Sequence, residues 1–191
     1  MSSAARRPHY SIEEYLVLER ISNVRHEYLD GDIFAMAGGT PEHAGICASL
    51  IILLGNAVRD RPSRVYTSDV RVRVQATGLD TYPDISVVCG PVQMDKDDRN
   101  AIVNPVLVVE VTSPSSEGYD RGAKLEHYRR IPALREVVLV AHDTQRVDVW
   151  RRRDDATWTS ESHGPGAVAR LDSLACELPV AEIYRNPLPA D

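Results

Sequence analysis

The sequence predicts an α/β domain in which helices flank a central mixed β-sheet. Two short runs, 81–90 and 104–114, are rich in β-branched residues and nearly all apolar, as strands covered on both faces tend to be. Segment 119–131 then shows helical spacing, and 135–143 is a further apolar run. Strand, helix and strand in this order predict a crossover between parallel strands. We expect one domain over residues 1–191, because this length is enough for one well-buried core and short for two.

The N-terminal region is predicted to form a short helix followed by a hairpin. Ser11 and Glu14 have the spacing of a capping box, and the segment after Ser11 has an approximate helical face. Asp30-Gly31 lies between two strand-like runs, and this dipeptide supplies the positive φ angles of a tight hairpin. Glu27 is then on the first arm of the hairpin.

A long helix and a strand follow. Thr40 and Pro41 form a strong helix start, so we expect a helix over 41–60 that is central to the fold. Its predicted apolar stripe is Ala44, Cys47, Ile51, Leu54 and Val58. Segment 63–78 alternates valines with polar residues, which predicts a half-buried strand with Arg71 and Arg73 on its outer face.

The C-terminal part is predicted to hold an edge hairpin over 145–162 and a short terminal helix within 174–186. The cysteines Cys47, Cys89 and Cys176 are odd in number and widely spaced among apolar residues. This pattern favours small buried hydrophobes over disulfides or a zinc site.

Composition limits the classes of function. A net charge of -6 argues against a generic nucleic-acid binder, which usually has a basic excess. It does not argue against a metal-dependent nuclease, because carboxylates that hold divalent cations also count as negative charge. No apolar run approaches the roughly 20 residues of a membrane span, and the N-terminus lacks the apolar region of a secretory signal. We therefore expect a cytoplasmic protein without a membrane partner.

Two acidic residues in the predicted core strands point to chemistry. Glu110 shares its strand face with Val108, where an ionised carboxylate is costly unless it is paired or metal-bound. Asp84 begins the other core strand directly after Pro83. Lys124 lies on the helix that should pack against this sheet, in a chain with two lysines and twenty arginines. Two carboxylates and an ammonium suit phosphodiester hydrolysis assisted by a metal ion.

The segments "YPDISVV" and "LVVEVTSPSSEGYDRGAKLEHYRRIPALREVVLV" resemble the Uma-type family of putative restriction endonucleases, a branch of the PD-(D/E)XK nuclease superfamily. The similarity extends from "RHEYLDGDIFAMAGGTPEH" to "LACELPVAEIY", which is most of the chain. It implies a restriction-endonuclease-like fold and a Mg²⁺-dependent endodeoxyribonuclease, with Mn²⁺ as a possible substitute.

The resemblance also assigns roles to residues. Asp84 would be the aspartate of the PD motif, Glu110 the second acid, Val111 a metal ligand through its carbonyl, and Glu27 a further metal-site acid. The position two after Glu110 is Thr112, where the superfamily pattern has lysine. The family's lysine has moved to the following helix, which implies that Lys124 fills its role here.

Three further residues are candidates for supporting the site, each with a structural alternative. His43 is more often a histidine in a helix-capping region than a ligand. Asp120 also suits a helix N-terminus, where its charge is favourable. Tyr128 is more typical of packing than of chemistry. Asp84 and Glu110 taken singly are as compatible with structural ion pairs as with a site, and Lys124 could be an ordinary i,i+4 partner of Asp120.

The expected function is therefore hydrolysis of DNA by a carboxylate-bound metal ion, with Glu27, Asp84, Glu110 and Lys124 as catalytic residues. A homodimer is expected because cutting both strands of a duplex needs two sites. Two alternatives stay open: a non-catalytic dimeric binding module that keeps the nuclease fold, and a metal phosphodiesterase for RNA or a small phosphate ester.

Overall fold

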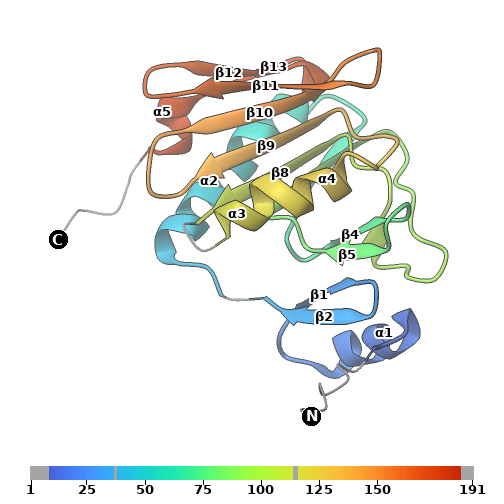
Figure 1. Cartoon of the computed structure of the whole chain (residues 1–191). Helices are drawn as coiled ribbons and strands as arrows, with labels where there is room; N and C mark the ends of the chain where they lie inside the picture. Colours follow the sequence, from blue (N-terminus) through green and yellow to red (C-terminus); the bar gives the residue numbers. More distant parts are fainter. Residues whose placement is uncertain (1–8, 37, 114–115, 186–191) are drawn as a thin grey trace, which may run out of the picture.

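A six-stranded mixed sheet forms the centre of the computed structural model, which describes residues 9–36, 38–113 and 116–185. Its strand order is β11-β10-β9-β8-β6-β3 (Figure 1). β8 and β9 are parallel, and the other neighbouring pairs are antiparallel. The strands are β3 (Ser63–Thr67), β6 (Ile85–Cys89), β8 (Leu107–Thr112), β9 (Glu136–Ala141), β10 (Val147–Arg152) and β11 (Trp158–His163). The predicted architecture, with its parallel pair and its edge hairpin of β10 and β11, is confirmed.

Helices cover both faces of this sheet (Figure 1). α2 (Pro41–Val58) packs on one face in a cluster that includes Val109. α4 (Leu125–Tyr128) packs on the other face in a cluster that includes Val108. Each fully buried aliphatic side chain of this kind stabilises the fold by about 1.5–3 kcal/mol. Since side chains alternate along β8, Glu110 belongs to the α4 face together with Val108.

A second, five-stranded sheet lies below the first in Figure 1, in the order β2-β1-β5-β4-β7. Its strands are β1 (His26–Leu29), β2 (Asp32–Ala35), β4 (Arg71–Val74), β5 (Leu79–Thr81) and β7 (Ala101–Ile102). α1 (Ile12–Ile21) packs beside it, where Tyr15 stacks on Tyr28 with ring centroids 5.1 Å apart. β1 of this sheet holds Glu27, whose carboxylate contacts Lys124 of the segment that packs on the central sheet.

The C-terminal region closes the fold next to β10. It contains β12 (Val168–Leu171), a 3₁₀ turn η2 (Asp172–Leu174), β13 (Cys176–Pro179) and α5 (Val180–Ile183). The terminal helix predicted within 174–186 is therefore mostly wrong, because its first part forms a two-stranded sheet with β12. Within the described residues of that segment, only 180–183 are α-helical.

Three local signals in the sequence are confirmed. Ser11 and Glu14 form the predicted capping box of α1. Asp30 and Gly31 have φ angles of 47° and 88°, as the tight turn between β1 and β2 requires. Thr40 caps α2 through its side-chain oxygen, and Pro41 begins the helix.

α2 covers one face of the sheet, as the prediction of a sheet flanked by helices requires, and it ends at Val58 rather than at 60. Its buried residues are Ile46, Leu50, Leu54 and Val58, which match the predicted stripe only at the last two positions. Ile52 on the outer side is 62% exposed. Because the helix packs on one sheet face, a single stripe is covered. In the part of the chain that the structure describes, α2 is the one helix long and apolar enough to cross a membrane, a test that core helices also pass.

Arg71 and Arg73 do not form a basic outer face. Arg71 is buried and donates to Asp98 and to the hydroxyl of Tyr82, and Arg73 pairs with Asp80. The reason is that α1 and the loop after β6 cover this face of β4. The single strand predicted over 63–78 is also wrong, because the segment divides into β3 and β4, which belong to different sheets. The partners that bury the arginines are distant in sequence.

The segment predicted as one helix over 119–131 is interrupted. It consists of α3 (Glu117–Tyr119), a kinked segment η1 (Asp120–Lys124) and α4. Gly122 has φ -104° and ψ -108°, outside the helical range, and marks a kink. The kink sets the direction of the residues on either side of it, including Lys124.

Candidate active site

Asp84 and Glu110 lie beside each other at one end of the central sheet. The antiparallel register pairs Ile85 with Val109, so one step further along the ladder Asp84 is level with Glu110. The backbone N–H of Val111 donates a 2.7 Å hydrogen bond to Oδ2 of Asp84. The sheet therefore holds Asp84 level with Glu110 along the ladder. The Asp84 carboxylate contacts His43 of α2, whereas the Glu110 carboxylate contacts Lys124 on the α4 face.

Lys124 connects the two sheets through a buried ion-pair network. Its Nζ lies 2.9 Å from Oε1 of Glu27 and 2.9 Å from Oε1 of Glu110. Oδ1 of Asp120 is 3.8 Å away. The lysine is 5% exposed and all three carboxylates are buried. One ammonium thus faces three acidic side chains away from solvent.

Hydroxyl groups orient the two glutamates. Tyr128 donates a 2.5 Å hydrogen bond to Oε1 of Glu110, and Thr81 on β5 donates to Oε1 of Glu27. Tyr119 places its ring centroid 5.9 Å from the Lys124 ammonium. Thr81 and Tyr119 were not among the predicted site residues, because a threonine in a strand and a tyrosine near a helix start carry no distinctive sequence signal.

The electrostatics reflect an excess of carboxylates. Burial raises the pKa of Glu110 to about 8; the Lys124 ammonium opposes this shift, while Asp84 and Asp120 add to it. Burial also raises the pKa of Asp120. For Lys124, burial favours the neutral amine, but Glu110 and the other nearby acids outweigh it and raise the pKa well above 10.5. The lysine therefore stays charged, and burial, with a smaller contribution from the neighbouring acids, makes Glu110 prone to protonation.

His43 contacts Asp84 from α2. Its Nε2 lies 3.2 Å from Oδ2 of Asp84, and its Nδ1 lies 3.7 Å from Sγ of Cys47, one turn later on the helix. The hydrogen bond to Asp84, followed by that to Cys47, raises the pKa of His43 to about 10. The histidine is thus an ion-pair partner of Asp84 near neutral pH.

Cysteines depart from the predicted pattern. All three are free, as expected, but Cys89 is exposed and Cys47 and Cys176 are partly exposed. The prediction that they are buried was wrong. Cys47 also adjoins the site, and the i,i+4 spacing of His43 and Cys47 on one helix face was the signal that could have indicated this.

The structure brings the predicted residues into two adjoining groups. Around Lys124 lie the predicted acids Glu27, Glu110 and Asp120, together with Tyr128. Asp84 lies between this group and His43. Glu27, Asp84 and Glu110 do not form a set of three ligand atoms within 4.8 Å; among the described residues, His43, Cys47 and Asp84 are the one such set. Metal ligation by the Val111 carbonyl stays a prediction.

Comparison with known proteins identifies the family. The model of the Uma2 family, described as "Putative restriction endonuclease", matches residues 12–181. This chain belongs to the Uma2 family. Uma2 membership supports nuclease activity in general.

Two relatives of this Uma2 protein come from Synechocystis sp. (strain ATCC 27184 / PCC 6803 / Kazusa). The uncharacterized protein slr1290 is 36% identical over 97% of this chain and 96% of its own length. The uncharacterized protein sll1609 is 30% identical over 76% of this chain and 82% of its own length. A solved structure with a similar fold is that of a putative nuclease of the DUF820 group from Anabaena variabilis ATCC 29413. It is 20% identical, with a TM-score of 0.75 and coverage of 92% of this chain and 97% of that chain.

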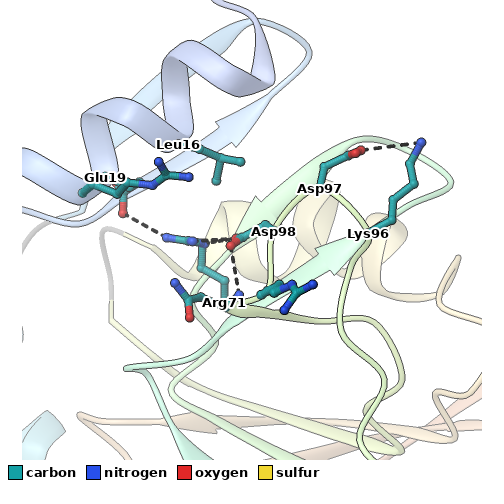
Figure 2. A pocket seen from close by; sticks show the side chains of 9 residues that line it. Leu16, Glu19, Arg71, Lys96, Asp97 and Asp98 are labelled. Atoms are coloured by element: carbon teal, nitrogen blue, oxygen red, sulfur yellow. Dashed lines mark hydrogen bonds and ion pairs between the residues drawn. The ribbon is translucent and has the colours of Figure 1, made fainter.

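A separate cavity of about 440 Å³ lies between α1 and the loop after β6 (Figure 2). Glu19, Arg71 and Asp98 meet there: Nη2 of Arg71 is 2.5 Å from Asp98, and Nη1 is 3.7 Å from Glu19. Because Arg71 bridges the two carboxylates, we interpret this contact as a structural link that joins β4 to α1 and to the loop after β6. The four residues predicted to be catalytic, Glu27, Asp84, Glu110 and Lys124, do not line this cavity.

Proposed function

We propose that this Uma2 protein is a Mg²⁺-dependent endonuclease that hydrolyses phosphodiester bonds in DNA, with Mn²⁺ able to replace Mg²⁺. The observation that carries this proposal is the buried position of Lys124, 2.9 Å from both Glu27 and Glu110 at the sheet end where Asp84 lies. A cluster of this kind, with more acids than ammonium groups, is costly for folding alone. Its cost is understandable if the cluster binds a cation and a phosphate.

The donor chemistry of the cluster fits a hard divalent cation. Glu27, Asp84, Glu110 and Asp120 carry four formal negative charges, of which Lys124 neutralises one and the His43 imidazolium a second. Carboxylate oxygens are the ligands that Mg²⁺ and Mn²⁺ prefer. We assign Asp84, Glu110, Glu27 and the Val111 carbonyl as the groups that would hold the ion. When bound, it would polarise the phosphate and lower the pKa of a water molecule.

The protein's own groups position this chemistry. Tyr128 orients Glu110 by its hydrogen bond, and His43 with the Val111 N–H orients Asp84. Lys124, kept charged by its acidic neighbours, would stabilise negative charge that develops on the phosphate. Asp120 supports the charge of Lys124 from one turn earlier in the chain. DNA as the substrate, a homodimer and a cytoplasmic location belong to the same proposal, the dimer because two strands need two sites.

Nicking of supercoiled plasmid at saturating Mg²⁺ tests the proposal. Wild type should nick, and chelation of the metal should stop it. Glu110→Gln should reduce both Mg²⁺ affinity and nicking, because it removes a ligand charge. Glu126→Gln is the matched control: its side chain is 66% exposed, and it pairs with Arg129 away from the site.

The outcomes separate the alternatives. Loss of nicking in well-folded Glu110→Gln, with full activity in Glu126→Gln, supports the endonuclease. Equal nicking by wild type and Glu110→Gln indicates a contaminating nuclease and refutes the assignment. Mg²⁺ binding without cleavage of DNA favours the binding module, and cleavage confined to RNA or a small phosphate ester favours the phosphodiesterase.

A further inference from the structure

A second group of potential ligands adjoins the acidic cluster and has a different chemical character. One ring nitrogen of His43, Sγ of Cys47 and one carboxylate oxygen of Asp84 all lie within 4.8 Å of one another. His43 and Cys47 are one turn apart on α2, so their side chains leave the same helix face. Asp84 reaches them from the entry of β6.

We propose that His43, Cys47 and Asp84 form a binding site for a borderline-soft transition-metal ion such as Zn²⁺. Nitrogen, sulfur and one carboxylate oxygen are a donor set that Zn²⁺ accepts and that Mg²⁺ does not select. Three protein ligands leave the fourth tetrahedral position for water or a substrate oxygen.

The spacing requires only small movements. With metal–ligand bonds of about 2.0–2.3 Å, the ligand atoms of a tetrahedral ion are roughly 3.3–3.8 Å apart. His43 Nδ1 and Cys47 Sγ are already 3.7 Å apart, and His43 Nε2 and Asp84 Oδ2 are 3.2 Å apart. A turn of the imidazole ring would direct one nitrogen to the ion, and the ring and the Cys47 thiol would release their protons to solvent as the ion binds. Gly39 leaves room for the ring, since a Cβ there would lie 3.0 Å from Nδ1 of His43.

The group is both held in place and reachable. The Val111 N–H fixes Asp84 from the sheet, an outer contact of the kind that orients metal ligands. The side chains of His43 and Asp84 are 22% and 17% exposed, and Cys47 is partly exposed. An ion can therefore arrive from solvent without unfolding the helix.

Asp84 would belong to both the Zn²⁺ site and the proposed Mg²⁺ site. If the proposed function holds, Zn²⁺ at His43 and Cys47 would withdraw Asp84 from the hydrolytic site and inhibit nicking. This consequence rests on the proposed function, whereas the binding of the ion does not.

Cobalt substitution tests the site directly. Purified, tag-free protein is titrated with Co²⁺, which replaces Zn²⁺ and gives a sulfur-to-cobalt charge-transfer band when a thiolate binds it. Wild type should show this band, and Zn²⁺ should abolish it by displacement. Cys47→Ser should lose the band, and His43→Gln should weaken Co²⁺ binding by at least about tenfold. Cys89→Ser is the matched control, because Cys89 is at the opposite end of β6 from Asp84.

The charge-transfer band in wild type and in the two cysteine variants decides whether the proposed site exists. A band in wild type and Cys89→Ser that is missing in Cys47→Ser supports the site. No band in wild type at saturating Co²⁺, or an unchanged band in Cys47→Ser, overturns it. Melting temperatures show whether each variant is folded, and Cys47→Ala replaces Cys47→Ser if serine disturbs α2. A nicking assay with added Zn²⁺ is a separate arm, so that failure of the nuclease proposal leaves the spectral result interpretable.

Discussion

Replacing Lys124 by methionine should destabilise the metal-free protein strongly. Methionine keeps an apolar stem of similar length but removes the ammonium that lies 2.9 Å from both Glu27 and Glu110. Since these carboxylates are buried, they cannot recover the interaction from water. Removing one partner of a buried ion pair typically costs about 3–5 kcal/mol. For a chain of this size, each kcal/mol corresponds to about 2–4 °C, so the melting temperature should fall by roughly 6–20 °C.

The loss should also depend on pH in a defined direction. Glu110 has a raised pKa of about 8, and Lys124 opposes that rise, so removing the lysine moves the pKa further up. Protonation at pH 6 then relieves one buried charge, and the destabilisation should be larger at pH 9 than at pH 6.

Denaturant unfolding of wild type, Lys124→Met and Lys96→Met at both pH values measures these free energies. Lys96→Met should stay within about 0.5 kcal/mol of wild type, because Lys96 is exposed. A Lys124→Met protein within about 1 kcal/mol of wild type at pH 9 would refute the buried network.

Two further substitutions, Glu110→Gln and Glu136→Gln, test how buried carboxylates contribute to the stability of the fold. In metal-free buffer, the pKa of Glu110 is about 8 in the folded protein and 4.5 ordinarily. Because the folded protein binds this proton more tightly, the contribution of Glu110 to the free energy of unfolding is fully present below pH 4.5. It is lost as the pH rises through 8. Glu110→Gln should remove this component, a few kcal/mol at most, and parallel stability–pH curves would contradict it. Glu136→Gln should cost about 2–4 kcal/mol in urea unfolding, because the fully buried carboxylate accepts from Arg151, from the backbone of Asp172 and from Ser173. Glu126→Gln, on an exposed side chain, is its control, and equal stabilities of the two variants would show that the Glu136 contacts are unimportant.

Features encoded by neighbouring residues were predictable from the sequence. The capping box of Ser11 and Glu14 and the positive φ angles of Asp30 and Gly31 depend on residues within one turn. Features that depend on distant partners were not. Arg71 is buried by Asp98 and Tyr82, and nothing local in "RVRV" distinguishes such an arginine from a solvated one.

In the candidate site too, features set by neighbouring residues were predictable and features set by distant partners were not. Glu110 and Asp84 were predictable because a charge within or at the entry of an apolar strand is costly without a partner. The contact of Lys124 with Glu27 could be expected only from the family resemblance, because it joins two sheets whose relative position no local pattern encodes. Cys47 was missed because a cysteine among apolar residues is usually an ordinary small hydrophobe.

The position of Lys124 gives a physical reason for the departure from the superfamily pattern at Thr112. Side chains on β8 alternate, so Glu110 and Thr112 face the same side, toward the crossover segment that contains η1 and α4. A lysine at 112 would enter this space from the strand, whereas Lys124 enters it from the helix that covers the strand. Both routes place an ammonium beside Glu110, and the kink at Gly122 directs the helical route. The proposed chemistry depends on the position of the charge, and the parallel crossover supplies two places in the chain from which a lysine can reach it.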